Sequence, residues 1–279
     1  MLPRSRGWVL IRNVPQSDAR DAMGLYPLFC CADWNGLRAD VEELGKEAVS
    51  LTLVADPFGD YGEADLREVF DVDHPFKEHF VTDLNKPLES FLSTHHRRHA
   101  RNALQVMTVE VCREPKTYLG DWVQLYDSLS ARHGIKGIRR FSREAFAKQF
   151  EVPGLVVFRA AVNGATVGMD LWYLQGAVAY NHLLAVSSLG YDLHASYALQ
   201  LRAFDYFAGK VRWFDWGGVA GADTSESAGL RRFKAGWSSE SLTSHLCGRV
   251  FDRALYDRLT AIAGASGTGY FPAYRAGEF

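Results

Sequence analysis

The chain has 279 residues, of which 47% are hydrophobic and 13% aromatic, enough to fill one large domain or two modest ones. Its 31 basic and 33 acidic residues give a formal net charge of -2. This balance excludes a protein whose whole surface binds nucleic acid or anionic lipid, because those ligands select strongly basic surfaces. We therefore expect any anion site to be local, and no DNA partner.

No export signal or membrane segment is visible in the sequence. The apolar run at residues 8–11 is interrupted by Arg12 and Asn13, and no window approaches the ~18 uncharged apolar residues of a membrane-spanning helix. The cysteines have neither CxxC spacing nor a disulfide or zinc pattern. They are Cys30, Cys31, Cys112 and Cys247. These features predict a soluble, cytoplasmic protein without membrane insertion or bound metal.

The N-terminal third mixes short strands and helices. Strands are predicted at residues 8–14, 49–55 and 78–83, and a helix at 34–46. Pro87 suits the first turn of a further helix that runs to about residue 107. This helix marks the predicted boundary between a domain at residues 1–86 and a second domain at residues 87–279.

Three arginines on that helix are candidates for binding a phosphate. They are Arg97, Arg98 and Arg101. Their spacing of three and four residues lets their guanidinium groups gather on one side and bind a phosphate bidentately. A solvated helix face is the alternative. A zinc site from His95 and His99 is disfavoured, because the neighbouring arginines oppose a cation there.

The central part of the chain predicts two helices and then a three-stranded meander. The helices are expected at residues 118–133 and after Ser142, which suits an N-cap. The strands are expected at residues 155–162, 166–174 and 177–186, joined by Asn163-Gly164 and Gln175-Gly176. Asn-Gly between two apolar runs is the strongest short hairpin signal, because both turn residues need positive φ.

A strand-helix-strand crossover follows the meander. A helix at residues 193–208 and a strand at 211–215 place that strand parallel to the last meander strand. The remaining elements are a helix at 225–234, a strand at 242–250 and a helix at 254–263. The predicted fold class is therefore α/β (α+β), with a mixed sheet and flanking helices.

The register of the meander predicts a polar cluster. Two-residue turns place Arg159 opposite Gly168 and Asp170 opposite Asn181. The side chains of Arg159, Asp170 and Asn181 then share one face of an otherwise apolar sheet. Asp170 is a candidate for orienting an amine nucleophile or accepting its proton. The alternatives are that the three residues only satisfy one another, or that this face is solvated.

Three further residues are candidates for chemistry. His182 is predicted on the opposite face, as a general base or as a hydrogen-bonded core histidine. Asp215 lies at the carboxyl end of a parallel strand, where α/β ligands commonly bind, or else it caps the following loop. Lys234 ends a short helix, where a lysine is ordinarily a partner of the helix dipole.

The loop at residues 187–192 precedes the crossover helix. Free N–H groups and the helix dipole at such a position favour an anion such as a pyrophosphate, so Gly190 and Tyr191 are candidates for donor binding. A simple strand-to-helix connector is the alternative, since Asp192 would repel an anion. No GxSxG, GxxxxGK[ST], HExxH or GxGxxG motif is present, which argues against hydrolase, kinase, zincin and dinucleotide functions.

Two motifs carry a resemblance to a known family. They are Phe214-Asp215-Trp216-Gly217-Gly218 and Gly229-Leu230-x-x-Phe233-Lys234-x-Gly236-Trp237. Together with the meander and the crossover, over residues 90–249, they resemble the FemAB-like branch of the GNAT acyltransferases. The resemblance implies a GNAT fold in which the parallel strands at 177–186 and 211–215 splay apart. It also implies two GNAT-like halves, with the N-terminal third as a reduced first half.

FemAB proteins transfer amino acids from aminoacyl-tRNA to peptidoglycan precursors, so the resemblance implies an N-acyltransferase with acyl-CoA or aminoacyl-tRNA as co-substrate and no tightly bound cofactor. The expected acceptor is an amine on a small or nucleotide-linked molecule, such as a cell-envelope precursor or a sugar amine. By this analogy Lys234 contacts the donor's phosphate or carbonyl oxygen, and the three arginines contact nucleotide or tRNA phosphates.

One departure from the family pattern counts against acyl-CoA as the donor. Residues 187–194 lack the Arg/Gln-x-x-Gly-x-Gly/Ala loop of coenzyme A-using relatives. The alternative function is a catalytically silent GNAT-like module that binds a nucleotide-linked sugar or tRNA through the arginine patch.

Overall fold

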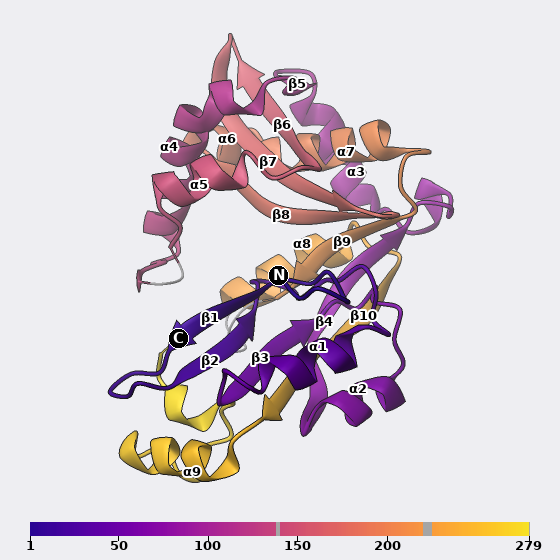
Figure 1. Cartoon of the computed structure of the whole chain (residues 1–279). Helices are drawn as coiled ribbons and strands as arrows, with labels where there is room; N and C mark the ends of the chain where they lie inside the picture. The colour runs from indigo at the N-terminus through magenta and orange to yellow at the C-terminus, as the bar shows by residue number, and fades with distance from the viewer. Residues whose placement is uncertain (138–139, 220–224, 279) are drawn as a thin grey trace. The chain divides into compact units, whose positions relative to one another are not determined.

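The computed structural model describes residues 1–137, 140–219 and 225–278 (Figure 1). The chain forms two compact units, one of Met1–Glu78 with Thr243–Phe279 and one of His79–Leu242. This division differs from the predicted one at residues 86 and 87, because the C-terminal segment returns to the N-terminal unit. There, β10 (Glu240–Val250) pairs antiparallel with β3 (Ser50–Ala55), a pairing that local sequence patterns do not reveal.

The first unit is built on strands from both ends of the chain. β1 (Val9–Asn13) pairs antiparallel with β2 (Arg20–Gly24), and β2 pairs parallel with β3. Its helices are α1 (Leu37–Leu44), α2 (Glu63–Val69) and α9 (Arg253–Ile262), with a 3-10 turn at Ala273–Arg275. Leu51, Leu53 and Val41 belong to its main apolar core. β2 and α2 were not predicted from the sequence.

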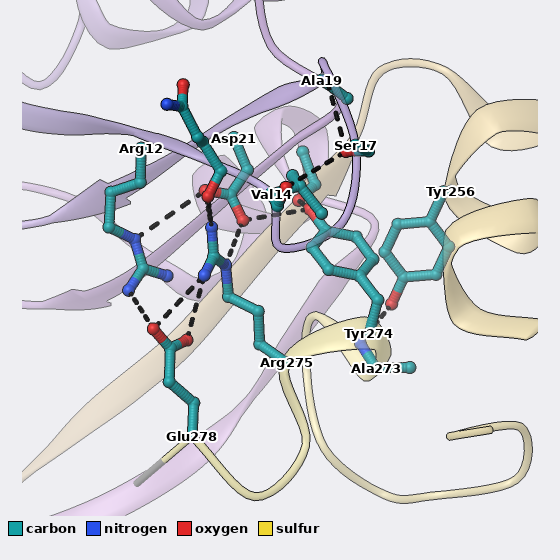
Figure 2. Close-up of polar contacts among 12 residues, drawn as sticks. Arg12, Val14, Ser17, Ala19, Asp21, Tyr256, Ala273, Tyr274, Arg275 and Glu278 are labelled. Carbon is teal, nitrogen blue, oxygen red and sulfur yellow. Dashed lines mark hydrogen bonds and ion pairs between the residues drawn. The ribbon is translucent and has the colours of Figure 1, made fainter. Parts of the chain in front are cut away.

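A buried polar cluster joins the C-terminal segment to β1 and β2 of this unit (Figure 2). The Arg275 guanidinium lies 2.6 Å and 2.9 Å from the two carboxylate oxygens of Asp21, and both residues are buried. Arg275 also donates to the carbonyl of Asn13, and Tyr274 donates its hydroxyl to Asp21. Glu278 bridges Arg275 and Arg12. The carboxylate of Asp21 is therefore fully paired.

The second unit contains a mixed sheet in the order β4-β9-β8-β7-β6-β5. Its strands are β5 (Thr108–Val111), β6 (Leu155–Val162), β7 (Ala165–Gln175), β8 (Val178–Val186), β9 (Trp213–Gly218) and the end of β4 (Val72–Asp83). All neighbours are antiparallel except β8 and β9, which are parallel. The predicted mixed sheet and crossover are confirmed, and β5 was missed.

Helices cover both faces of this sheet (Figure 1). They are α3 (Thr94–Ala103), α4 (Leu119–Arg132), α5 (Arg143–Gln149), α6 (Ser188–Asp192), α7 (Ala195–Phe207) and α8 (Ser225–Ala235). Phe158 packs in one core with α3 and α7, whereas its neighbour Val157 packs in another core with α4 and α5. Successive strand residues therefore serve opposite cores, as the two-residue period of a strand requires.

The helix predicted from Pro87 to residue 107 is shorter than expected. A 3-10 turn at Leu88–Ser90 comes first, and α3 begins only at Thr94 because Ser93 caps it. The Ser93 hydroxyl accepts a hydrogen bond from the N–H of His96, as a helix N-cap does. Across the described ranges, the helices are all too short or too polar to cross a membrane.

Candidate active site

The parallel pairing of β8 and β9 ends early. The two strands pair only at Val178 with Trp213, Ala179 with Phe214, and Tyr180 with Asp215 in the described part of the chain. β8 continues to Val186 beyond the last pair, whereas β9 remains paired with β4 as far as Gly218. The two parallel strands thus separate after Tyr180 and Asp215, in agreement with the splayed strands that the resemblance implies.

A polar group gathers at the carboxyl end of β9, where this separation begins. The buried Asp215 carboxylate accepts a hydrogen bond from the N–H of Gly217 at 2.7 Å and lies 2.9 Å from Nδ1 of His79. Gly217 has a φ of +75°, which a residue with a side chain rarely adopts. Lys234, from α8, donates its ammonium to the carbonyl of Gly218 at 2.7 Å. The Asp215 carboxylate thus caps the loop after β9 and also pairs with the His79 ring.

His79 is itself buried, with 5% of its surface exposed, and its pairing with Asp215 has the geometry of a proton-accepting dyad. A neutral imidazole that donates its Nδ1 proton to a carboxylate keeps a lone pair on Nε2, which can accept a proton from another group. Sequence reasoning missed His79, although it lies in a predicted strand. The two residues are 136 positions apart, and only the antiparallel pairing of β4 with β9 brings them together.

Asp170 forms a second polar group, on β7. Its carboxylate is wholly buried and accepts hydrogen bonds from Nε1 of Trp172 at 2.6 Å and from Nδ2 of Asn181 at 2.7 Å. Burial raises the pKa of Asp170 to about 7, although the two hydrogen bonds oppose the rise. A carboxylate without exposed surface reaches a substrate only through a neighbour. The half-buried Asn181, which follows Tyr180 on β8, is that neighbour.

The predicted cluster of Arg159 with Asp170 is wrong. The turn at Asn163-Gly164 is as expected, but a β-bulge between Ala160 and Ala161 shifts the ladder, so that Arg159 lies opposite Met169 instead of Gly168. A one-residue shift moves a side chain to the other face. On that face, the Arg159 guanidinium donates hydrogen bonds to the Thr166 hydroxyl, the Gly164 carbonyl and the Glu110 carboxylate.

The predicted register of the second hairpin is also wrong. The ladder begins with Gln175 opposite Val178, and a second bulge lies between Leu171 and Trp172. Asn181 therefore lies opposite Trp172 and not opposite Asp170. The two predicted partners still meet, because Asp170 and Trp172 share one face of β7 and the Asn181 amide reaches Asp170 diagonally.

His182 lies on the side of the sheet covered by α4 and α5. Its Nε2 is 3.0 Å from Oε1 of Gln149, and its ring packs against Tyr173 and Phe141. Burial lowers the pKa of His182 to about 4, so the ring is neutral at pH 7. These contacts fit the hydrogen-bonded core histidine that the sequence analysis gave as the alternative to a general base.

Gly190 has a packing role. Its N–H donates to the Ser187 hydroxyl, which caps α6. A Cβ at this position would overlap the carbonyl of Val167 on β7. The N–H that was expected to bind a phosphate is thus already used within the loop. The neighbouring Tyr191 is exposed, and the Arg132 guanidinium lies 4.9 Å from its ring centre.

The arginine patch lies on α3. Arg98 and Arg101 are exposed and Arg97 is half-buried. No ion pair or hydrogen bond of these guanidinium groups is recorded within residues 1–137, 140–219 and 225–278. The same ranges hold no group of three or more His, Cys, Asp or Glu side chains arranged to bind a metal ion.

Neither a known family model nor a curated protein matches the sequence. Solved structures do match the fold. FemX has a TM-score of 0.72 at 15% identity, with 90% of this chain and 85% of FemX covered. This chain has a FemAB-like fold. A second similar structure is the C-terminal domain of a "Putative Lysylphosphatidylglycerol Synthetase" from Agrobacterium fabrum. Its TM-score is 0.63 at 14% identity, and the match covers 94% of this chain and 86% of that domain.

A third structure with the FemAB-like fold is L-PGS from Bacillus licheniformis. Its TM-score is 0.63 at 13% identity, and the match covers 94% of this chain and 87% of that one. The FemAB-like fold predicted from the motifs around Asp215 and Lys234 is thereby confirmed. At this level of identity the likeness concerns the fold, and the roles of individual residues rest on their own geometry.

Proposed function

We propose that this protein transfers an acyl or aminoacyl group from an activated donor to an amine acceptor. The observation that carries the proposal is the polar group where β8 and β9 separate. There, the dyad of His79 and Asp215 and the ammonium of Lys234 come from three different elements. Acyl transfer needs a proton acceptor and groups that stabilise an oxyanion.

Each of these residues has a role in the proposed reaction. The acceptor amine attacks the carbonyl carbon of the donor and forms a C–N bond while its proton passes to Nε2 of His79. Asp215 positions the imidazole. The oxyanion is stabilised by Lys234 and by backbone N–H groups of the separated strands. When the carbonyl re-forms, the bond to the donor's sulfur or oxygen breaks, and the leaving group takes up the proton.

The donor that we favour is an aminoacyl-tRNA. The N–H of Gly190 is used by Ser187, and residues 187–194 lack the loop of coenzyme A-using relatives. One structure with this fold is named for the synthesis of lysylphosphatidylglycerol, an aminoacylated lipid. Acyl-CoA is the second donor to test. The proposed acceptor is an amine on a small or nucleotide-linked molecule, such as a cell-envelope precursor, in the cytoplasm.

The test is a turnover assay with purified protein. A panel of charged tRNAs and acyl-CoAs is offered with amine acceptors, and uncharged tRNA or free thiol is measured. We expect release that depends on the amine. His79→Gln should lower kcat/KM by about 10²–10⁴-fold, because it removes the proton acceptor. The matched control is His74→Gln, which changes an exposed histidine on the same strand.

Two outcomes would contradict the proposal. If no donor in the panel is consumed although one of them binds, the protein is a silent binding module and not a transferase. If a donor is consumed but His79→Gln and His74→Gln are equally active, the transfer stands and the role of the dyad is wrong.

A further inference from the structure

Three histidine side chains other than His79 form a cluster on the surface of the second unit. The ring centres of His95 and His99 on α3 are 4.3 Å apart, and those of His99 and His194 are 4.2 Å apart. Tyr197, on the first turn of α7, lies within 6.0 Å of all three rings. His95 and His194 are exposed and His99 is half-buried. We call these three residues the histidine cluster.

The charged groups around the histidine cluster are basic. The pKa of His99 is lowered by burial and then by the charges of His194, His95 and Arg98. Asp192, on α6, is the acid closest in sequence to His194, and within the described residues its carboxylate makes no hydrogen bond or ion pair with the three rings.

His96 is distinct from the histidine cluster, although it lies on the same helix. It is buried, with its ring nitrogens 2.6 Å from the Ser93 hydroxyl and 2.9 Å from the Phe233 carbonyl. A Cβ at Gly236 would overlap its ring. His96 therefore joins α3 to α8, and its ring also lies 5.6 Å from that of His95 and 5.0 Å from that of Tyr197. It differs from the histidine cluster in that it is buried and both of its ring nitrogens are already bonded.

An anion is the ligand that suits this arrangement. Adjacent imidazoles and a guanidinium oppose one another's positive charge, and a phosphate dianion relieves that repulsion while accepting their hydrogen bonds. A metal site is disfavoured, because the Arg98 guanidinium opposes a cation there and the described residues hold no group of three or more His, Cys, Asp or Glu side chains arranged to bind a metal ion. We propose that the histidine cluster, with Arg98, binds a phosphate group of the donor and takes up protons as it does so.

This proposal rests on the proposed function, because it assigns the donor's phosphates to the surface of α3 and the start of α7. The sign of its pH dependence follows from linkage. A bound dianion raises the pKa of each imidazole that it contacts, so the complex holds more protons than the free protein. Affinity then rises as the pH falls, by up to about tenfold per pH unit for each proton taken up.

The experiment uses inorganic pyrophosphate and the full chain. Its dissociation constant is measured by calorimetry at pH 8, 7 and 6, in two buffers of different ionisation enthalpy, which gives the number of protons taken up. We expect the dissociation constant to fall as the pH is lowered. His99→Gln, which cannot be protonated, should flatten that dependence. Arg98→Ala should weaken binding at every pH, since an arginine stays charged throughout.

The matched control is Arg202→Ala. Arg202 is an exposed arginine on α7 that pairs with Asp205, and its removal should leave pyrophosphate binding unchanged. Circular dichroism checks that each variant is folded. The proposal is overturned if pyrophosphate does not bind at pH 6, or if a folded His99→Gln protein keeps the pH dependence of the natural chain.

Competition separates the two sources of phosphate. Coenzyme A and uncharged tRNA are each tested for displacement of pyrophosphate. Displacement by only one of them identifies that molecule as the ligand, and displacement by neither overturns the assignment to a donor. Because these experiments measure binding and not turnover, the proposed phosphate site can be wrong even if the protein is a transferase. Conversely, pyrophosphate can bind here in a protein that transfers nothing.

Discussion

Asp170 is a residue whose environment gives a definite pH dependence. Its pKa of about 7 in the folded chain, raised by burial, lies above the value of roughly 3.9 for an unfolded chain. The folded state therefore binds more protons than the unfolded state between about pH 4 and pH 7. The resulting stability is fully present below pH 4 and is lost as the pH rises through 7.

We predict that Asp170→Asn removes this dependence. An asparagine at position 170 keeps the shape of the side chain. Its oxygen can accept the hydrogen bond from Trp172, and its NH2 group can donate to the oxygen of Asn181 once the Asn181 amide is turned over. Relative to the variant, the natural chain should lose roughly 2–3 kcal/mol of unfolding free energy between pH 5 and pH 8. Urea denaturation at the two pH values measures this. If the natural chain and the variant differ in unfolding free energy by the same amount at pH 5 and pH 8, Asp170 does not titrate in this range.

Asp40 offers a control of opposite sign. Burial by itself raises the pKa of Asp40, but hydrogen bonds from Ser5 and Arg4 outweigh it and the pKa is lowered. A depressed pKa contributes stability above the unfolded value, and this stability is lost as the pH falls. Asp40→Asn should therefore destabilise the chain by about 1–3 kcal/mol at pH 7 and by less at pH 3.

At the scale of elements, α6 depends on close packing against β7. The Gly190 backbone lies against the carbonyl of Val167, and a Cβ at Gly190 would overlap that carbonyl. The contact is with backbone, so no flexible side chain can move aside. The short helix α6 can pack here because residue 190 is a glycine.

We predict that Gly190→Ala destabilises the second unit. Overpacking of this kind costs typically about 1–3 kcal/mol, and thermal denaturation measures the loss. The matched control is Gly120→Ala in α4, where a Cβ would meet nothing within 4 Å. Alanine is the better helix former by roughly 0.5–1 kcal/mol, so this variant should be slightly stabilised. Equal stability of the two variants would contradict the packing role of Gly190.

At the scale of the whole molecule, the first unit is completed by the end of the chain. Arg275 is a buried guanidinium that pairs with the buried Asp21 on β2, 254 residues earlier (Figure 2). Removing one partner of a buried ion pair leaves the other charge unpaired in a medium of low polarity. The stability of this unit should therefore depend on residues that no continuous N-terminal domain contains.

We predict that Arg275→Ala lowers the free energy of unfolding by about 3–5 kcal/mol, because it leaves the buried Asp21 with only the more distant Arg12, whose Nε lies 3.8 Å from the carboxylate. Arg20→Ala is the control, since Arg20 pairs with Glu47 at the surface with both side chains about half exposed. Such a pair contributes about 0–1 kcal/mol. Chemical denaturation compares the two. A similar small loss in both variants would show that the cluster around Asp21 tolerates the missing cation.

Local signals in the sequence determined most of the second unit. Asn163 and Gly164 have positive φ, and Val162 lies opposite Ala165 as a two-residue turn requires. Ser142 caps α5 as predicted. The strand-helix-strand spacing fixed the parallel pair of β8 and β9. These features depend on residues close together in the chain, whose backbone preferences and apolar period act without the rest of the fold.

The tertiary structure decided the candidate site. The bulge after Ala160 moved Arg159 to the other face, and the pairing of β4 with β9 brought His79 to Asp215. The packing of α3 against α7 brought His99 to His194. A bulge adds one residue to a strand without changing its apolar pattern in an obvious way. Contacts between distant elements depend on how whole strands and helices pack, so the residues that meet there cannot be read from spacing alone.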